Sequence, residues 1–360
     1  MTIPIRDTHQ SPLSYSHDLD SGFSSQVEEL NQIMGHELRT PLTSIQSALK
    51  ILHSGQFGSF SQTGQRLLEI ALKNTRRLVR LSQAIENQST MAMTCLSPND
   101  IARLRLENEL EAALHRHELQ LYYQPIVTFE TQDIIGFEAL TRWYHPTRGW
   151  ISPNEFIPIA ETTGLIDDLG LWVLEQACRQ MVMWQQQFPQ ASSLTMSVNL
   201  STLQLSNPRL PKQIEAILQQ THLSPQNLRL EITESAFLDH SPLALKCLQK
   251  LKAMGILLYI DDFGTGYSSL SRLQDWPIDV IKIDNTFVRS QQWTMIQAIM
   301  LLAESLNVDV IAEGIETLED LAQLQQLGCQ QGQGYLFSRP LPPQLITTQL
   351  ACHSSSQLIG

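Results

Sequence analysis

The sequence predicts an α/β protein in which an all-α helical hairpin precedes a TIM-type (β/α)8 barrel. Over residues 23–90, apolar residues recur every three or four positions, which is the period of amphipathic helices. From about residue 110 to residue 350, short apolar runs alternate with amphipathic helices, which is typical of strands connected by helices. A doubly wound open sheet is the alternative, although no glycine fingerprint follows the first apolar run.

The hairpin is predicted from two apolar stripes separated by a Gly- and Ser-rich break at residues 54–64. Because two helices alone cannot bury both stripes, we expect the hairpin to dimerise into a four-helix bundle. The segment before it is rich in Ser, His, Asp and Pro and shows no periodicity. The expected segments are a disordered N-terminus, the hairpin, a linker, the barrel domain and a flexible tail, at residues 1–22, 23–90, 91–104, 105–348 and 349–360.

Charge and composition narrow the function classes. The 360 residues carry a net charge of −12, and residues 107–360 alone carry −13. Such an acidic domain is unsuited to duplex nucleic acid, because phosphates require basic counter-charge, so any phosphate ester must bind together with cations. No apolar run approaches the ~20 residues of a membrane span. No secretory signal is recognisable, and the five cysteines show no pairing or metal-binding spacing. We therefore expect a cytoplasmic protein without membrane contact.

Eight apolar runs are the candidate strands of the barrel. Helices between them carry their own end signals, such as Ser152-Pro153 before one helix and Gly255 after another. The candidate strands are residues 119–127, 134–140, 194–200, 228–233, 255–261, 280–284, 309–314 and 334–338. Nearly every one carries a polar residue at or near its end, and in a barrel these ends meet at the C-terminal mouth. The polar residues are Glu138, Asn199, Glu231, Asp261, Asp262, Lys282, Glu313 and Gln333.

Carboxylates gathered at one mouth repel each other strongly unless cations compensate them. Oxygen ligands without Cys or His clusters suit Mg²⁺, Mn²⁺ or Ca²⁺ better than zinc. The adjacent Asp261 and Asp262 would allow a bridge between two metals about 3.5–4 Å apart, a common arrangement for cutting phosphodiesters. The alternative is that these residues are helix caps or a solvated acidic surface that binds nothing.

The motifs around these residues resemble those of the EAL domain family, which comprises cyclic di-GMP phosphodiesterases with a TIM-barrel fold. The resemblance covers residues ~105–345 and rests on GFEALTRW, SVNLS, LEITES, IDDFGTGYSSL, VIKIDNTFV, IAEGIET and QGYLFSRPLP. It implies hydrolysis of cyclic di-GMP to linear pGpG with Mg²⁺ or Mn²⁺ at a two-metal site. Thr141 departs from the family pattern, which usually has an apolar residue there, and we expect its side chain to point away from the mouth.

The resemblance also implies a role for each site residue. The metal ligands would be Glu138, Asn199, Glu231, Asp261, Asp262 and Glu313. The catalytic residues would be Glu313, Lys282 and Glu138, and the substrate-binding residues Arg142, Gln124 and Gln333. Glu313 is the candidate base, Lys282 would position the attacking water, and Glu234 would brace the DDFGTGYSS loop. Because this loop and its brace are both present, the sequence favours an enzyme over a non-catalytic cyclic di-GMP receptor.

The segment MGHELRTPL at residues 34–42 resembles the H-box of the HisKA dimerisation domains of histidine kinases. His36 offers a nitrogen nucleophile, and Glu37 can hold its other nitrogen. No ATP-binding domain follows, so we do not expect autophosphorylation. Three roles stay open for the hairpin: homodimerisation, phosphate acceptance at His36 from a histidine kinase or a response-regulator receiver, and docking or dephosphorylation of a receiver through Thr40. A phosphotransfer protein with a passenger barrel is therefore a further alternative.

Overall fold

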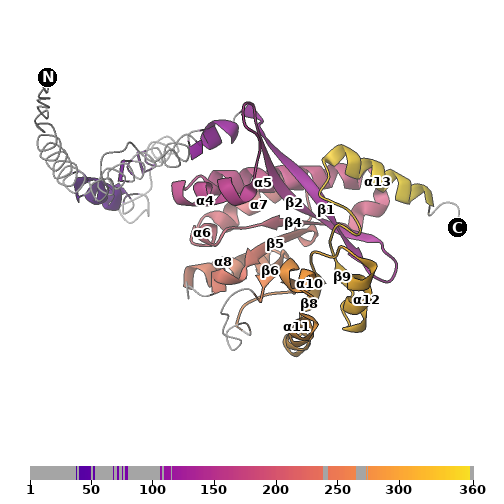
Figure 1. Cartoon of the computed structure of the whole chain (residues 1–360). Coiled ribbons are helices and arrows are strands. Elements are labelled where there is room, and N and C mark those ends of the chain that lie inside the picture. The colour runs from indigo at the N-terminus through magenta and orange to yellow at the C-terminus, as the bar shows by residue number, and fades with distance from the viewer. Residues whose placement is uncertain are drawn as a thin grey trace, which may run out of the picture. The chain divides into compact units, whose positions relative to one another are not determined.

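The computed structural model describes most of the barrel domain and scattered positions before it. The described residues are 38, 40–49, 52, 68, 71, 72, 75, 78, 79, 106, 107, 109–114, 116–237, 242–264, 273 and 275–356. The chain divides into two units, residues 1–105 and 106–360, and each is described by itself (Figure 1). Within the described part, no helix has the length and apolar character that crossing a membrane requires.

The described part of the first unit is helical, in line with the predicted hairpin. Residues 40–49 form a helix in which the Ser44 hydroxyl donates a hydrogen bond of 3.1 Å to the Thr40 carbonyl. The side chains of Leu38 and Ile45 are 43% and 49% exposed in the single chain, as expected for an apolar stripe that a second copy would cover. His36 and Glu37 lie outside the described residues.

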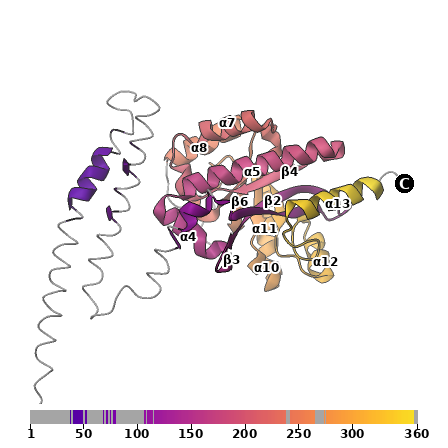
Figure 2. The same cartoon turned by 90° about the horizontal axis from the view of Figure 1, so that it is seen from above.

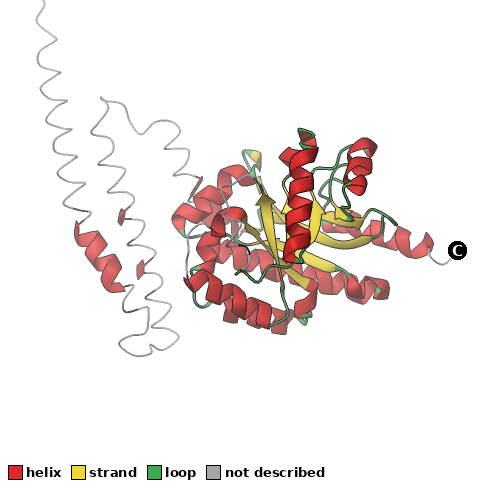
Figure 3. Cartoon of the chain, turned by 90° about the horizontal axis from the view of Figure 1, so that it is seen from below, coloured by secondary structure: helices red, strands yellow, loops and turns green. Residues whose placement is uncertain are grey.

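The second unit is a closed barrel, which confirms the predicted fold class (Figure 3). Around the barrel the strands follow the order β1-β9-β8-β7-β6-β5-β4-β2, β1 pairs with β2 to close it, and β3 extends β2 outward. The strands are β1 (Leu119–Thr128), β2 (Ile134–His145), β3 (Gly149–Ile151), β4 (Thr195–Asn199), β5 (Leu228–Thr233), β6 (Leu257–Phe263), β7 (Val280–Ile283), β8 (Asp309–Ala312) and β9 (Gln331–Gly332).

Helices cover the outside of the barrel, and α5, α7 and α8 lie side by side on it (Figure 2). The helices are α4 (Pro153–Thr163), α5 (Ile166–Gln187), α6 (Thr202–Leu205), α7 (Leu210–Thr221), α8 (Pro242–Ala253), α10 (Asn285–Arg289), α11 (Trp293–Leu306), α12 (Leu318–Gln326) and α13 (Pro343–Ser356). Ser152 caps α4 by accepting a hydrogen bond from the Asn154 amide, with Pro153 at the first helical position, as predicted.

Three details differ from the sequence-based expectation. The first strand, β1, runs antiparallel to both neighbours, because only the short turn 129–133 connects it to β2. The eighth strand is Gln331–Gly332 rather than residues 334–338, which form a turn. At Gly334 a Cβ would lie 2.1 Å from the Ile315 carbonyl oxygen, so this backbone packs directly against the loop after β8. The tail predicted at 349–360 is helical through Ser356, because Ile346 and Leu350 bury one face of α13.

Two clusters of buried apolar side chains stabilise the barrel. The larger lies between the strands and the surrounding helices, and it includes Trp184 of α5, which is 1% exposed and packs against Phe137. The smaller lies inside the barrel and joins the side chains of Ile126, Tyr259, Val280 and Ile311. This inner cluster lies below the mouth, so the polar residues there have apolar side chains beneath them.

We predict that Trp184→Ala lowers the free energy of unfolding by about 3–5 kcal/mol, because it leaves a cavity between α5 and the strands. Its neighbour Met183 is 59% exposed, so Met183→Ala should change this free energy by less than about 0.5 kcal/mol. Urea unfolding of the full chain, followed by circular dichroism, measures both. Equal midpoints for the two variants would contradict this account of the core.

Candidate active site

The polar residues of the mouth come from successive strands whose register brings them together. Asn199 of β4 lies beside Glu231 of β5, and Asp261 of β6 lies beside Thr233, so these parallel strands present their polar residues at the same edge. In the antiparallel pair, Gln124 of β1 lies opposite Glu138 of β2. The predicted convergence of the polar residues at one end of the barrel is therefore present in the structure.

Lys282 lies at the centre of this group, and its side chain is fully buried. Its Nζ atom is 2.7 Å from a carboxylate oxygen of Glu231 and 2.7 Å from one of Glu313. Oxygens of Asp261 and Glu138 lie 3.0 and 3.4 Å from the same atom. A single ammonium group therefore contacts four carboxylates.

Two amide side chains complete the environment of Glu138. The Nδ2 atom of Asn199 donates to Glu138 Oε1 at 2.8 Å, and the Nε2 atom of Gln333 donates to Glu138 Oε2 at 2.7 Å. Gln333 Nε2 also lies 3.0 Å from Glu313 Oε1. Each oxygen of Glu138 thus accepts a hydrogen bond from an amide, which fixes the orientation of this carboxylate.

Burial and mutual charge shift the pKa values of the cluster in different directions. Burial by itself raises the pKa of Glu138, but Lys282 and the two amide hydrogen bonds outweigh it and hold this pKa below its usual value. Burial and the charge of Glu138 raise the pKa of Glu231 well above its usual value, although Lys282 opposes them. Burial likewise raises the pKa of Glu313 to about 8, again against Lys282. The lysine alone does not compensate all four carboxylates.

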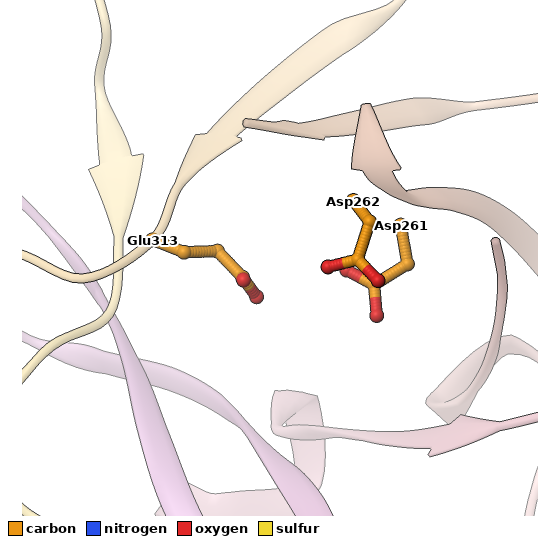
Figure 4. A group of neighbouring side chains, drawn as sticks. All are labelled: Asp261, Asp262 and Glu313. Atoms are coloured by element: carbon orange, nitrogen blue, oxygen red, sulfur yellow. The ribbon is translucent and has the colours of Figure 1, made fainter. Parts of the chain in front are cut away.

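Asp261 and Asp262 both reach the mouth because β6 is irregular at this point. Neighbouring residues of a regular strand face opposite sides. Here Asp262 has a φ of 55°, and the pairing with β7 shifts register between Ile260 and Phe263. The local bulge turns both carboxylates toward Glu313, as Figure 4 shows. Ligand atoms of Asp261, Asp262 and Glu313 all lie within 4.8 Å of one another.

Divalent cations fit this donor set. The group offers carboxylate and amide oxygens, the ligands that Mg²⁺ and Mn²⁺ prefer. Three buried oxygens of this group have no hydrogen-bond partner among the described residues: Glu231 Oε1, Asp261 Oδ1 and Gln333 Oε1. Asp261 Oδ1 lies near Lys282 Nζ, but without the alignment of a hydrogen bond. Buried acceptors without donors are costly, and a cation would satisfy them.

The predicted substrate-binding residues lie around the carboxylates. Gln124, Glu313 and Gln333 line a cavity of about 120 Å³ beside the cluster, together with Tyr335. Arg142 lies four residues beyond Glu138 on β2, and its guanidinium lies 5.9 Å from the centre of the Tyr122 ring. Thr141 is half-buried, and alternation along β2 places it on the opposite face of the strand from Arg142.

Glu234, the predicted brace, contacts the start of the loop that follows β6. Buried Glu234, in the short helix η4 (Glu234–Phe237), accepts a hydrogen bond of 2.8 Å from the Gly264 amide. Gly264 has a φ of 99°, and a Cβ there would lie 2.8 Å from the Phe287 ring, so only glycine suits this position. Residues 265–270 of the loop lie outside the described residues.

Sequence reasoning missed one acidic neighbour of the cluster. Asp284 is buried, follows β7 directly and hydrogen bonds to Asp262. Burial, Asp261 and Asp284 together raise the pKa of Asp262 to about 6. The sequence does contain a signal for Asp284, because this residue ends the same apolar run that carries Lys282. Asp284 also caps α10 by accepting from the Thr286 amide, so it links that helix to the site.

Comparison with known proteins assigns the family. The model of the EAL domain matches residues 107–340, and the model of the His Kinase A (phospho-acceptor) domain matches residues 26–91. The chain therefore belongs to the EAL domain family, with a segment before the barrel that matches the HisKA domain. Both resemblances drawn from the sequence are confirmed.

Several curated relatives share this domain. Cyclic di-GMP phosphodiesterase PdeR of Escherichia coli is 38% identical over 244 residues, which cover 66% of this chain and 36% of PdeR. The bifunctional diguanylate cyclase/cyclic di-GMP phosphodiesterase MucR of Pseudomonas aeruginosa is 36% identical over 330 residues, covering 90% of this chain and 46% of MucR. The chain thus spans less than half the length of these relatives.

Solved structures agree with the fold. The PaMucR phosphodiesterase in complex with c-di-GMP is 41% identical and superimposes with a TM-score of 0.64 over 67% of this chain and 99% of that one. The EAL enzyme Bd1971 bound to cAMP and cyclic-di-GMP is 32% identical, with a TM-score of 0.68 over 81% of this chain and 77% of that one.

We predict that Lys282→Met destabilises the metal-free protein by about 3–5 kcal/mol, because the buried carboxylates lose their counter-charge. Mg²⁺ or Mn²⁺ should recover part of this loss by supplying positive charge at the same place. Melting temperatures in chelator and in added metal measure both effects. Lys250→Met on the exposed surface of α8 is the control, and equal melting temperatures of the two variants in chelator would contradict the assignment.

Proposed function

We propose that the protein hydrolyses one phosphodiester bond of cyclic di-GMP and releases linear pGpG. The observation that carries this proposal is the convergence of Glu138, Glu231, Asp261 and Glu313 around Lys282 at the barrel mouth. Relatives of the same family are named cyclic di-GMP phosphodiesterases, which supports the choice of nucleotide. In the reaction, a water oxygen bonds to phosphorus, the bond to one ribose 3′ oxygen breaks, and that oxygen takes a proton.

The proposed metal site uses the oxygens described above. One cation would be held by Glu138, Asn199, Glu231 and Asp261, and a second by Asp261, Asp262 and Glu313. Bound Mg²⁺ or Mn²⁺ supplies charge that neutralises the phosphate and lowers the pKa of a water. The shared residue Asp261 and the close approach of its carboxylate to those of Asp262 and Glu313 support a two-metal arrangement.

The chain's own residues position the reactants in this proposal. Lys282 offsets phosphate charge and orients the attacking water, because its ammonium already lies among the carboxylates. Glu313 takes a proton from that water, and the hydrogen bond from Gln333 holds it in place. Arg142 clasps a phosphate oxygen through its guanidinium, and no described carboxylate lies within ion-pairing distance of it to compete.

We predict that the purified chain linearises cyclic di-GMP with Mg²⁺ or Mn²⁺, and that chelator abolishes this turnover. Glu138→Ala and Glu313→Gln should each lower kcat by at least about 100-fold, because Glu138 would hold a cation and Glu313 would take the proton of the attacking water. Chromatography of the nucleotides measures the product. Glu319→Gln, at the first turn of α12, is the matched control. If cyclic di-GMP is still intact after prolonged incubation with the unmutated protein and metal, the proposal that the protein is an enzyme is refuted.

The same preparation separates the enzyme from a non-catalytic receptor. A receptor would bind cyclic di-GMP in chelator and leave it intact. The carboxylate cluster favours an enzyme over a receptor. A pocket that only binds a nucleotide does not require buried carboxylates or buried oxygens without hydrogen-bond partners. Calorimetry of nucleotide binding, with and without metal, gives the decisive comparison.

We further propose that the HisKA-like segment makes the protein a homodimer. The match over residues 26–91 and the exposed apolar side chains of Leu38 and Leu78 support this. Removal of residues 1–104 should convert the dimer to a monomer, as light scattering would measure, or change the specific activity of the barrel. A truncated protein that keeps both the dimeric state and the specific activity of the full chain would contradict the proposal.

Phosphate transfer to this segment is a separate proposal that rests on the matched H-box. Exposed Thr40 on the helix of residues 40–49 is compatible with contact to a receiver. Incubation with a labelled phospho-receiver should move the label to His36 or release it as free phosphate. Label that stays on the receiver in the presence of the full chain would refute this role.

A further inference from the structure

An aromatic wall rises from the site on the face of the sheet that carries Glu138. The side chains of β1 and β2 alternate between the barrel interior or mouth and the surrounding helices. Phe137, Ala139 and Trp143 belong to the outer core, so Glu138, Leu140, Arg142 and Tyr144 share the other face. Register places Tyr122 opposite Leu140, and Trp150 of β3 opposite Tyr144.

Three aromatic rings contact each other on this face. The ring centres of Tyr122 and Trp150 are 5.9 Å apart, and those of Tyr144 and Trp150 are 5.0 Å apart, both with edge-to-face geometry. Trp150 is 55% exposed and Tyr144 is 48% exposed. We name Tyr122, Tyr144 and Trp150 the aromatic wall. Its exposed ring surface is available for stacking.

Position and charge suit this wall to a base of a nucleotide. Tyr144 lies two residues beyond Arg142 on β2, or about 7 Å along the strand, and Trp150 lies opposite Tyr144, so the exposed rings adjoin the residue proposed to hold a phosphate. Arg142 lies between the carboxylates and the outer rings, with its guanidinium over Tyr122. On this face of β1, β2 and β3, all of which are described, no acidic residue lies beyond Glu138. The wall therefore does not repel a phosphate-bearing ligand as the mouth does.

We propose that the aromatic wall binds a guanine base of the substrate by stacking, next to the phosphate held by Arg142. This inference rests on the proposed function, because it assumes that a guanine nucleotide occupies the mouth. Every base offers a π-face, and stacking on aromatic side chains is a common way to hold bases without hydrogen bonds. Trp150 is the central member, because it contacts both other rings. The alternative role of these rings is to stabilise the β2–β3 hairpin as a cross-strand pair.

Kinetics of the full chain with saturating metal tests the wall. Trp150→Ala should raise the KM for cyclic di-GMP about 5- to 100-fold, as expected for the loss of one base stack, and change kcat less than about threefold. Trp150→Phe keeps an aromatic face and should recover most of the affinity. Met183→Ala, which removes a similarly exposed apolar side chain from α5, should leave KM unchanged. Melting temperatures of all variants report on hairpin stability.

The possible outcomes distinguish a failure of the aromatic-wall proposal from a failure of the proposed function. If the unmutated chain turns over the nucleotide and Trp150→Ala keeps its KM, the wall proposal is overturned and the enzyme stands. If Trp150→Ala changes only the melting temperature or the oligomeric mass, the rings serve the hairpin or a protein contact, which also overturns it. If the unmutated chain binds cyclic di-GMP without turnover, dissociation constants replace KM in the same comparison. If it neither binds nor cuts the nucleotide, both proposals fail.

Discussion

The buried ammonium of Lys282 is the interaction on which the barrel mouth depends. Four carboxylates lie within 2.7–3.4 Å of it, and none of them could stay charged and buried at this spacing without compensation. One positive charge is insufficient, as the raised pKa values of Glu231 and Glu313 show. Further cations would therefore complete the charge compensation of these carboxylates. In the proposed reaction these cations share the compensation, and the lysine becomes available to the substrate phosphate.

The strands of the barrel differ in length, and this places the carboxylates apart from Arg142 and the aromatic wall. Short parallel strands such as β7 and β8 end at the mouth and hold the charged residues above the apolar cluster inside the barrel. That cluster surrounds the lower side of the group with apolar side chains, and low polarity strengthens each electrostatic interaction next to it. The β1–β2 pair is longer, with 10 and 12 residues, and it extends beyond the carboxylates to Arg142 and the aromatic wall. The proposed sites of hydrolysis and of substrate recognition thus lie on neighbouring parts of one sheet.

Much of this arrangement is readable from local sequence. Alternation of apolar runs with helices indicates the barrel, and polar residues after apolar runs indicate its mouth. The helix start at Ser152 follows from capping preferences that act within a few residues. Residues 334–338 show the limit of local patterns. An apolar run is predicted to be a strand when the segment that packs against it is unknown. Packing of Gly334 against Ile315 decides against a strand there.

The sequence by itself determined which polar residues gather at the mouth, because their types and their places at strand ends follow from local patterns. Only the tertiary structure decided how they meet. The antiparallel direction of β1, the bulge at Asp262, and the contact of Lys282 with four carboxylates all depend on pairing between segments distant in the chain. The aromatic wall is of the same kind, because Tyr122 and Trp150 are neighbours only through the register of three strands. Local preferences act over a few residues, whereas register is fixed by the closure of the whole barrel.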